Sequence, residues 1–368
     1  MKISYGPEAF FQKYGGVSKY FLRIADGLAK KGHEVEIFSP FFVTQGLEQI
    51  SHARFEGEPV TFDSKLSRSA LRTLSTIKGR SKIRIRRPDI FHPTYYSLMD
   101  LVPTAAKTIV TVYDFVHERV GGRNFIDIEL TKLRKRTTIN RADLILAISE
   151  STRADLLEFF PGIDPGKVVV THLGVDSEFF FHRTSEPTEG RRSILWVGQR
   201  GGYKNFAVVI SALSLLPKSI LHDVDLVLFG GEPLGDETFG ALVKIGLKPT
   251  QISHVFGDDS ELIKRYRTSH MMLYTSLYEG FGLPILESMA SGCPVICGAV
   301  SSMPEVAGDS ALIVDVTKPE EVAIAIQALF DDSELHQQYQ KLGYHRASLF
   351  PWDACVEKTE SAYLRCLE

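Results

Sequence analysis

Residues 276–306 read SLYEGFGLPILESMASGCPVICGAVSSMPEV, and no other stretch of the chain is as informative about its architecture. It places two carboxylates, Glu279 and Glu287, eight positions apart around a Gly-Phe-Gly turn that opens a helix. Pro284 suits the first helical position, because its missing N–H costs nothing there and its φ is already helical. The N–H groups of residues 281–285 then lie near a helix N-terminus, where they can donate to hydroxyl or phosphate oxygens. This pattern favours a polyhydroxylated ligand that carries phosphates, such as a sugar nucleotide.

The run resembles the donor-binding domain of the retaining glycosyltransferases of family 4, which carries EGFG-[LF]-P-x-x-E followed by a small-residue loop and P-E. The matching residues are Glu279–Glu287, Ser291–Val295 and Ser302–Glu305. The likeness continues in the family's order from Gly15-Gly16 to Trp352. It implies an α/β protein of the GT-B fold, with two Rossmann-like doubly wound domains that face each other across a cleft. It also implies a hexosyltransferase that uses a nucleotide-sugar donor.

Length and composition indicate a globular protein with two domains. A chain of 368 residues is too long for one ordinary core and suits two domains of about 180 residues. Its hydrophobic content of 44% and charged content of 24% are ordinary. No apolar run approaches the roughly eighteen residues that a membrane-spanning helix needs. Because Met1–Tyr5 enters a short strand directly, neither a signal peptide nor a transit segment is evident.

The four cysteines indicate free thiols rather than a metal site. They lie in the last quarter of the chain and lack the spacing of metal ligands. Cys293 and Cys297 bracket an apolar strand, which favours buried thiols. We therefore expect a cytoplasmic enzyme with neither a metal nor a cofactor.

The net charge of −3 hides an asymmetry between the two halves. Residues 1–185 hold 27 Lys and Arg against 21 Asp and Glu, a balance of +6, whereas the remainder holds 15 against 24, a balance of −9. Nine basic residues and no acid fall within residues 64–88, and a second cluster comprises Lys132, Arg134, Lys135 and Arg136. The segment 64–88 is either a solvated basic face or a surface that contacts anionic membrane or a pyrophosphate-linked lipid. Nucleic acid is not expected as a partner, because no recognition module accompanies the charge.

Apolar strands alternate with amphipathic helices, which predicts parallel sheets covered by helices. The strands predicted in the first half are Ile3–Tyr5, Val35–Ser39, Ile90–His92, Thr108–Tyr113, Leu144–Ser149 and Val168–His172. Those predicted in the second half are Ser193–Val197, Asp225–Phe229, His254–Phe256, Met271–Thr275, Val295–Cys297 and Ala311–Val314. We expect helices at Val17–Lys31, Asn205–Leu216, Glu320–Phe330 and Trp352–Leu367.

The loop-like segment Arg183–Arg192, rich in Glu, Thr, Ser, Pro and Gly, is the predicted linker. The predicted domains are residues 1–185 on the acceptor side and residues 186–350 for the nucleotide sugar. Residues 351–368 are expected to form a helix that crosses back to the first domain, as in relatives of the family. Ligands of such sheets lie beyond the carboxyl ends of the strands, and each candidate motif follows such an end.

Two glycine-containing turns are candidates for binding the donor phosphates, with plain solvent-exposed turns as the alternative. Gly15-Gly16 precedes a predicted helix, whose N–H groups and missing side chains would let a phosphate approach. The run VGQRGGYKN resembles the family's basic loop, and the matching residues are Gly198, Arg200 and Lys204. Fixed cations there stabilise the negative charge that develops on the departing nucleotide. The family more often has arginine directly after the first glycine, where this chain has Gln199.

The resemblance also implies roles for the residues around the Gly-Phe-Gly turn. Glu279 would bind hydroxyls of the donor sugar, and Glu287 would hold the ribose hydroxyls. The backbone amides expected to contact the sugar are those of Phe281, Gly282 and Leu283. The turn expected to line the nucleobase holds Phe256 and Gly257, for which an ordinary strand end is the alternative.

The chain departs from the family at the end of one strand in the first half. Many relatives carry His-Asp there, with the histidine beside the donor sugar, whereas this chain carries Tyr113-Asp114. Tyrosine can donate a hydrogen bond, but it does not ionise near neutral pH as histidine can. His117, three residues after Asp114, is a candidate substitute, with a surface loop histidine as the alternative. Asp114, His92 and Tyr95 are candidate acceptor-side groups.

The resemblance implies a front-face reaction with retained configuration, in which the departing phosphate takes the acceptor proton and no side-chain nucleophile is needed. GDP-mannose is the preferred donor from overall likeness to bacterial surface-polysaccharide mannosyltransferases, and a glycan or lipid-linked glycan is the expected acceptor. A sugar-nucleotide 2-epimerase of the same fold and a non-catalytic nucleotide-sugar-binding protein are the alternatives. An NAD-dependent oxidoreductase is disfavoured, because no G-x-G-x-x-G follows any predicted strand.

Overall fold

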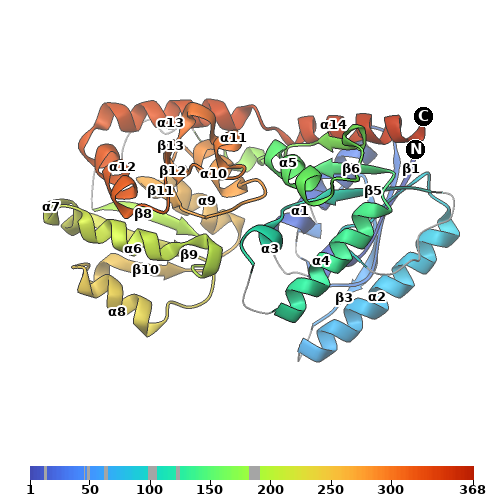
Figure 1. Cartoon of the computed structure of the whole chain (residues 1–368), viewed down its shortest axis with the longest axis horizontal. Coiled ribbons are helices and arrows are strands. Elements are labelled where there is room, and N and C mark those ends of the chain that lie inside the picture. The colour runs from blue at the N-terminus through green and yellow to red at the C-terminus, as the bar shows by residue number, and fades with distance from the viewer. Residues whose placement is uncertain are drawn as a thin grey trace. The chain divides into compact units, whose positions relative to one another are not determined.

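The computed structural model describes residues 1–11, 15–44, 46–47, 50–61, 65–97, 106–121, 125–181 and 191–368. The chain divides into two compact units. Unit 1 is Met1–Gly174 together with Trp352–Glu368, and unit 2 is Val175–Pro351. Each unit is a parallel β-sheet with helices packed against it (Figure 1). Most of the predicted linker, with the boundary predicted after residue 185, falls on residues 182–190, which are outside the described residues.

Within the described part of unit 1, seven parallel strands lie in the order β3-β2-β1-β4-β5-β6-β7. Their bounds are β1 (Lys2–Tyr5), β2 (Glu34–Phe42), β3 (Arg54–Pro59), β4 (Ile90–His92), β5 (Lys107–Val112), β6 (Leu144–Ala147) and β7 (Val168–Val170). β1 is an inner strand, with Ile3 opposite Val35 of β2 on one side and Ile90 of β4 on the other. The strand order reverses between β1 and β4, which is the doubly wound arrangement.

Helices connect and flank the strands of this sheet. They are α1 (Gly16–Lys30), α2 (Lys65–Arg86), α3 (Val116–Arg119), α4 (Phe125–Asn140), α5 (Glu150–Phe159) and α14 (Trp352–Leu367). α1 buries Tyr20, Phe21, Ile24, Ala25 and Leu28 at the spacing expected of one helix face. α1 ends at Lys30, two residues before Gly32, whose φ is 91°.

The C-terminal helix α14 is part of unit 1 although all of unit 2 separates it from the rest of that unit in sequence. It packs closely on α1, because a Cβ on Gly27 would lie 2.5 Å from a methyl carbon of Val356. The Tyr363 hydroxyl lies 3.1 Å from the hydroxyl of Tyr5 and 2.5 Å from Nδ1 of His92. The last helix of the chain therefore completes the core that contains the first strand.

In unit 2, six parallel strands lie in the order β10-β9-β8-β11-β12-β13 among the described residues. Their bounds are β8 (Arg192–Val197), β9 (Val224–Phe229), β10 (Ile252–Val255), β11 (Met271–Tyr274), β12 (Val295–Gly298) and β13 (Leu312–Val314). The helices are α6 (Phe206–Leu215), α7 (Lys218–His222), α8 (Asp236–Lys244), α9 (Asp259–Thr268), α10 (Leu283–Ala290), α11 (Met303–Ala307), α12 (Pro319–Asp331) and α13 (Ser333–Ser348). β8 is central, with Leu195 opposite Val227 of β9 and Met272 of β11.

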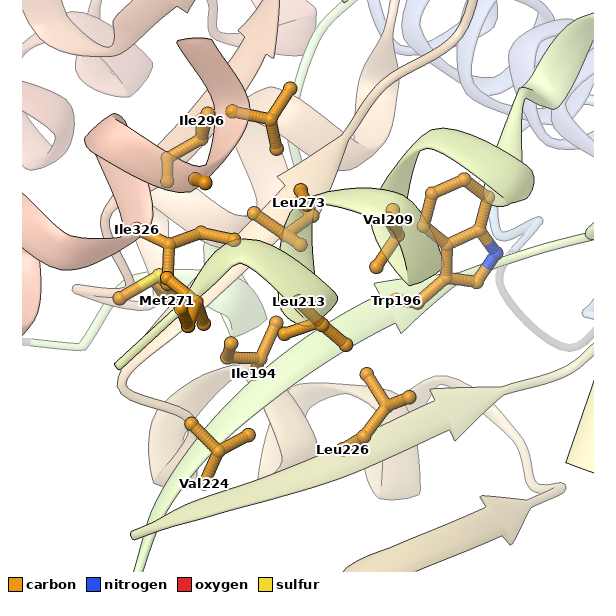
Figure 2. Packing of buried hydrophobic residues seen from close by; sticks show 14 of the residues in the cluster. Ile194, Trp196, Val209, Leu213, Val224, Leu226, Met271, Leu273, Ile296 and Ile326 are labelled. Carbon is orange, nitrogen blue, oxygen red and sulfur yellow. The ribbon is translucent and has the colours of Figure 1, made fainter. Parts of the chain in front are cut away.

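The main core of unit 2 joins the sheet to α6 and α12 (Figure 2). The strands contribute Ile194, Leu226 and Leu273, all within 1% of complete burial. Leu213 of α6 and Ile326 of α12 are fully buried against them. Apolar burial on this scale fixes the strand register, and the register in turn fixes where the loops at the carboxyl ends of the strands lie.

The prediction of an α/β protein with two doubly wound domains is confirmed. Each predicted strand is present, with ends that differ by at most three residues. The strand that sequence reasoning missed is β3, which reads RFEGEP and lies at the edge of its sheet. An edge strand needs only one partner and is half exposed, so β3 lacks the apolar run that marks the central strands.

Candidate active site

The loop after β8 holds two predicted donor-side residues, Gly198 and Arg200, and both contact the end of β9 in unit 2. Gly198 follows β8 directly and has a φ of 104°, a left-handed conformation that suits glycine. Its N–H donates to the carbonyl of Phe229, the last residue of β9, at 2.9 Å. The Arg200 guanidinium reaches the same loop, with Nη1 3.0 Å from the carbonyl oxygen of Gly230. Burial lowers the pKa of Arg200, and the negative charge of Glu232 opposes this shift.

Lys204 and Glu279 form an ion pair at the carboxyl ends of β8 and β11. Lys204 ends the short 3-10 helix η5 (Gly202–Lys204), and its Nζ lies 2.5 Å from Oε1 of Glu279. Their side chains are 20% and 13% exposed. The ammonium also lies over the rings of Tyr203 and Tyr274, at 5.1 and 5.5 Å from their centroids. The structure thus places in direct contact a cation and a carboxylate that sequence reasoning assigned separately.

The turn between β11 and α10 is held by a neighbouring serine loop. Gly282 precedes α10 with a φ of 110°, which disfavours any residue with a side chain. The Ser302 hydroxyl lies 2.8 Å from the carbonyl oxygens of both Glu279 and Phe281. Ser301 accepts the N–H of Glu279 on its Oγ at 2.9 Å, and its own φ is 51°. The backbone that presents Glu279 is therefore fixed from two sides.

Glu287 lies one turn inside α10, as predicted. α10 begins at Leu283, so Pro284 is its second residue rather than the first. Both positions leave the missing proline N–H without cost, since the first N–H groups of a helix have no partner within it. Oε2 of Glu287 accepts the Tyr266 hydroxyl at 3.2 Å.

The turn predicted to line a nucleobase follows β10. Phe256 is 59% exposed, and its ring centroid lies 4.3 Å from that of His254. Nε2 of His254 lies 2.8 Å from the carbonyl oxygen of Gly230, which also accepts from Arg200. A Cβ on Gly257 would lie 2.5 Å from Cβ of Glu261, so only glycine fits without a shift of α9. His254, which packs on the exposed Phe256 ring, thus shares the Gly230 carbonyl with Arg200 of the basic loop.

The Gly15-Gly16 turn opens α1 in unit 1. Gly15 is the N-cap residue and is extended, and its carbonyl accepts the Lys19 N–H at 3.1 Å and the Ser18 hydroxyl at 2.9 Å. As a glycine it offers no side-chain acceptor to the first turn of the helix. Gly16 is exposed. Residues 12–14, which precede the turn, are outside the described residues.

Tyr113 follows β5 directly, and its side chain is almost completely buried. The hydroxyl donates to the carbonyl of Thr94 at 3.4 Å, and the ring stacks on Tyr95 with centroids 6.1 Å apart. Burial raises the pKa of Tyr113 well above its usual value. The hydroxyl is therefore neutral and directed into unit 1, unlike the ionisable histidine of the relatives.

Asp114 is partly buried and is held by the backbone N–H of Val116 and by a lysine. Its Oδ1 accepts the N–H of Val116 at 3.1 Å, and its carbonyl accepts Nζ of Lys135 at 2.9 Å. Lys135 is 1% exposed and also donates to both carboxylate oxygens of Glu118. The sequence placed this lysine in a basic cluster, whereas the structure places it in the interior.

The remaining acceptor-side candidates differ in burial. His92 is fully buried, with Nδ1 2.5 Å from the Tyr363 hydroxyl and Nε2 3.0 Å from Oγ1 of Thr111. Burial lowers the pKa of His92 to about 3. His92 therefore belongs to the core of unit 1 and not to an acceptor rim. Tyr95 is half-buried, which raises its pKa to about 12, and His117 lies partly exposed on α3.

Sequence reasoning missed the side chains that hold the two carboxylates. Tyr274 lies in an apolar strand and Tyr266 in a mostly polar helix, so neither stands out from its neighbours. Ser301 and Ser302 belong to the small-residue loop of the family pattern, which was the available signal.

In the parts of the chain that the structure describes, no group of three or more His, Cys, Asp and Glu is placed to hold a metal ion. None of the helices described here has the length and apolar character to cross a membrane.

Comparisons with known proteins agree with this arrangement. Residues 14–179 match the family described as Glycosyltransferase Family 4, and residues 177–346 match Glycosyl transferases group 1. The chain belongs to glycosyltransferase family 4. This family 4 glycosyltransferase is a hexosyltransferase of glycan biosynthesis.

Relatives of the glycosyltransferase align along nearly its whole length. The O-antigen chain mannosyltransferase B of Escherichia coli is 26% identical over 382 residues, which cover 99% of each protein. Sucrose-phosphate synthase from Thermosynechococcus elongatus has a TM-score of 0.77 at 20% identity, covering 99% of this chain and 98% of that one. HepE of Anabaena, solved in complex with UDP-glucose, has a TM-score of 0.74 at 15% identity, covering 98% and 99%. These structures share the GT-B fold with the present chain.

Proposed function

We propose that this glycosyltransferase moves a hexose from a nucleotide-sugar donor to a hydroxyl of a glycan or lipid-linked glycan, with retention of the anomeric configuration. The observation that carries the proposal is the contact between Lys204 and Glu279 beside the Gly282 turn. A sugar diphosphate needs cations for its phosphates and acceptors for its hydroxyls. This loop cluster supplies both kinds of group within hydrogen-bonding distance of each other.

The proposed reaction is a front-face displacement. The bond between the anomeric carbon and the phosphate oxygen breaks, and the acceptor oxygen bonds to that carbon from the same face. The acceptor proton passes to the departing phosphate oxygen, so no side-chain nucleophile takes part. Arg200 and Lys204 stabilise the negative charge that develops on the diphosphate. Glu279 accepts hydrogen bonds from the sugar hydroxyls and orients the ring.

The rest of the donor would lie against the other donor-side residues. Glu287 would accept the ribose hydroxyls, and the exposed ring of Phe256 would stack on the nucleobase. We propose GDP-mannose as the donor, supported by the likeness to an O-antigen chain mannosyltransferase along 99% of the chain. HepE, which binds UDP-glucose, shares the fold, so a donor panel must include both nucleotides.

The test is nucleotide release from GDP-mannose, UDP-glucose, UDP-N-acetylglucosamine, UDP-galactose and GDP-fucose, with and without mannose oligosaccharides as acceptors. Wild type is compared with Glu279→Ala and with Glu321→Ala. Glu321 is a matched control, because it is a carboxylate of unit 2 that also pairs with a lysine, Lys318. We expect wild type and Glu321→Ala to consume one donor and Glu279→Ala to lose at least about 100-fold in rate.

Unchanged turnover by Glu279→Ala contradicts the assignment of the site. The anomeric configuration of the product, read from its proton coupling in NMR, tests retention separately. An inverted product contradicts the front-face mechanism and leaves the donor assignment standing.

Helix α2, which carries most of the basic segment 64–88, turns polar groups toward the sheet. Ser75 lies within hydrogen-bonding distance of both the backbone N–H and carbonyl of Phe41. Arg80 pairs with Glu8 at 2.8 Å, and both side chains are 3% exposed. Further along the helix, ion pairs join Lys82 to Glu56 and Arg86 to Glu36. Part of the positive charge is therefore neutralised within unit 1.

The opposite side of α2 exposes apolar and basic residues together. Leu74, Ile77 and Ile85 are 40%, 41% and 79% exposed, and Lys78 and Arg84 lie among them. A helix that presents apolar side chains and cations to solvent suits the interface of an anionic membrane. We propose that this face makes peripheral contact with the membrane, where a lipid-linked acceptor is available. We also propose a cytoplasmic location, supported by the free cysteine thiols, which are typical of reducing compartments.

Vesicle flotation tests the membrane contact. Wild type should float with vesicles that contain phosphatidylglycerol and remain unbound with pure phosphatidylcholine. Ile77→Ser with Ile85→Ser should lose most of the binding. Ile324→Ser serves as a control, because Ile324 is 67% exposed on α12 of unit 2. Equal flotation with both vesicle types contradicts the proposal.

A further inference from the structure

A buried tyrosine lies beside each of the two carboxylates of the donor site. Tyr266, on α9, is fully buried, and its hydroxyl donates to Oε2 of Glu287 at 3.2 Å. Tyr274, the last residue of β11, is 4% exposed and lies under the Lys204 ammonium that pairs with Glu279, which places the phenol near enough to that carboxylate for the charge to raise its pKa. Each carboxylate therefore has a tyrosine of its own, and the two tyrosines come from different elements.

Both tyrosines act as donors only. Burial, and then the neighbouring carboxylate, raises the pKa of Tyr266 and of Tyr274 well above the usual value. A phenol that keeps its proton can donate to an ionised carboxylate, which can only accept. Such charge-assisted hydrogen bonds are roughly twice as strong as those between neutral groups.

The rings themselves are fixed by packing. Tyr266 packs edge to face on Phe179, with ring centroids 6.1 Å apart. Tyr274 lies beneath the Lys204 ammonium, and a Cβ on Gly282 would lie 3.7 Å from its ring. Because the rings cannot shift freely, each hydroxyl holds its carboxylate at one place.

Lys204 is a partner that a donor would draw away. Its Nζ contacts Oε1 of Glu279, and in the proposed reaction the same ammonium serves the diphosphate. A carboxylate held by Lys204 alone would become free to rotate when the phosphates arrive. Tyr274 supplies a second donor that the phosphates do not compete for.

We propose that Tyr274 and Tyr266 are positioning residues, which hold Glu279 and Glu287 in the orientation that binds the nucleotide sugar. The inference rests on the proposed function of the site and deepens it. It assigns each tyrosine to a different part of the donor. Tyr274 acts on the hexose through Glu279, and Tyr266 acts on the ribose through Glu287.

Tyrosine-to-phenylalanine variants test this while keeping the packed ring. We expect Tyr274→Phe to lose about tenfold in kcat/KM, which corresponds to about 1.4 kcal/mol. It should bind the free nucleoside diphosphate as wild type does in calorimetry, because that ligand lacks the hexose. Tyr266→Phe should lose about tenfold in affinity for the same nucleoside diphosphate.

Double variants show whether each tyrosine acts through its carboxylate. Adding Tyr274→Phe to Glu279→Ala should change kcat/KM by less than about twofold, because the group that Tyr274 positions is already absent. Adding Tyr266→Phe to Glu279→Ala should keep its full effect, since it acts through Glu287. Tyr339→Phe, a partly buried tyrosine of unit 2 packed against the core, controls for loss of a hydroxyl alone.

Two results overturn the inference alone. In the first, wild type is active and Tyr274→Phe has the same kcat/KM. In the second, Tyr274→Phe lowers kcat/KM by the same factor whether or not Glu279 is present. A wild type that transfers no hexose from any donor contradicts the proposed function and this inference with it. Thermal melting of each variant separates these results from a failure to fold.

Discussion

The Lys135 ammonium lies 2.9 Å from a carboxylate oxygen of Glu118 and equally far from the carbonyl oxygen of Asp114, in the interior of unit 1. The ammonium also lies 4.5 Å from the ring centroid of Phe115. A lysine is rarely buried unless it is paired, and here an acid, a carbonyl and an aromatic ring satisfy it. Lys135 of α4 therefore anchors the loop that carries Asp114 through a buried hydrogen bond.

Removing Lys135 should destabilise unit 1 strongly. Lys135→Met leaves the Glu118 carboxylate without its cation, which costs about 3–5 kcal/mol for a buried pair. Lys135→Met with Glu118→Gln should be more stable than the single variant, because no uncompensated charge remains. Urea unfolding measures both. Lys132→Met, which breaks an exposed pair with Glu129, should cost less than about 1 kcal/mol.

Stability should fall in mild acid because of His92. Burial lowers the folded-state pKa of His92 from 6.5 to about 3, so the unfolded chain binds a proton between these values that the folded chain does not. The free energy of unfolding therefore falls as the pH drops below 6.5, by up to about 1.4 kcal/mol per pH unit. Between pH 7 and pH 5 this amounts to about 2 kcal/mol.

Urea unfolding at both pH values checks the His92 contribution. His92→Gln should show a smaller loss between pH 7 and pH 5 than wild type, even if it is less stable overall. His52→Gln is the control, because His52 is an exposed histidine of the same unit. An identical pH dependence in wild type and His92→Gln contradicts the prediction.

Loss of Lys204 should impair turnover more than stability. Lys204→Met removes a cation from the departing diphosphate, and the loss of one such group costs about 100-fold or more in kcat. The Lys204–Glu279 pair is less buried than the Lys135–Glu118 pair, because the lysine side chain is 20% exposed rather than 2%, so the melting temperature should fall less than in Lys135→Met. Steady-state kinetics with the preferred donor measure the effect. Lys318→Met, which breaks exposed pairs with Asp315 and Glu321, should leave kcat unchanged.

The turn that presents Glu279 should not tolerate a side chain at Gly282. With a φ of 110°, Gly282→Ala places an L-residue in a strained conformation that costs about 1–3 kcal/mol. We expect a lower melting temperature and a higher KM for the donor. Gly240→Ala should instead stabilise the protein by about 0.5–1 kcal/mol, since Gly240 is inside α8 with open space around its Cβ position.

The fold could be predicted largely from local sequence, because buried parallel strands are continuous apolar runs and most of the helices between them are amphipathic. β3 escaped prediction for the same reason, as its edge position requires no apolar run. Pro284 was placed within one residue of its helical position, which shows how tightly capping chemistry constrains a helix start.

The site could be predicted only in part. Lys204 and Glu279 were identified separately through the family pattern, but their contact joins residues 75 positions apart. Lys135 was assigned to a basic cluster, because sequence does not reveal that Glu118 lies opposite it. Tyr266 and Tyr274 carry no local signal, since a tyrosine that donates to a carboxylate looks like any core aromatic residue.

The placement of α14 has a consequence for how the protein is made. β1 is synthesised before unit 2 and α14 after it, yet Tyr363 of α14 contacts Tyr5 of β1. On the ribosome, unit 2 emerges complete while unit 1 still lacks the helix that covers part of its core. The earlier part of unit 1 therefore exposes apolar surface until α14 has emerged. We therefore expect unit 1, rather than unit 2, to need chaperones during synthesis.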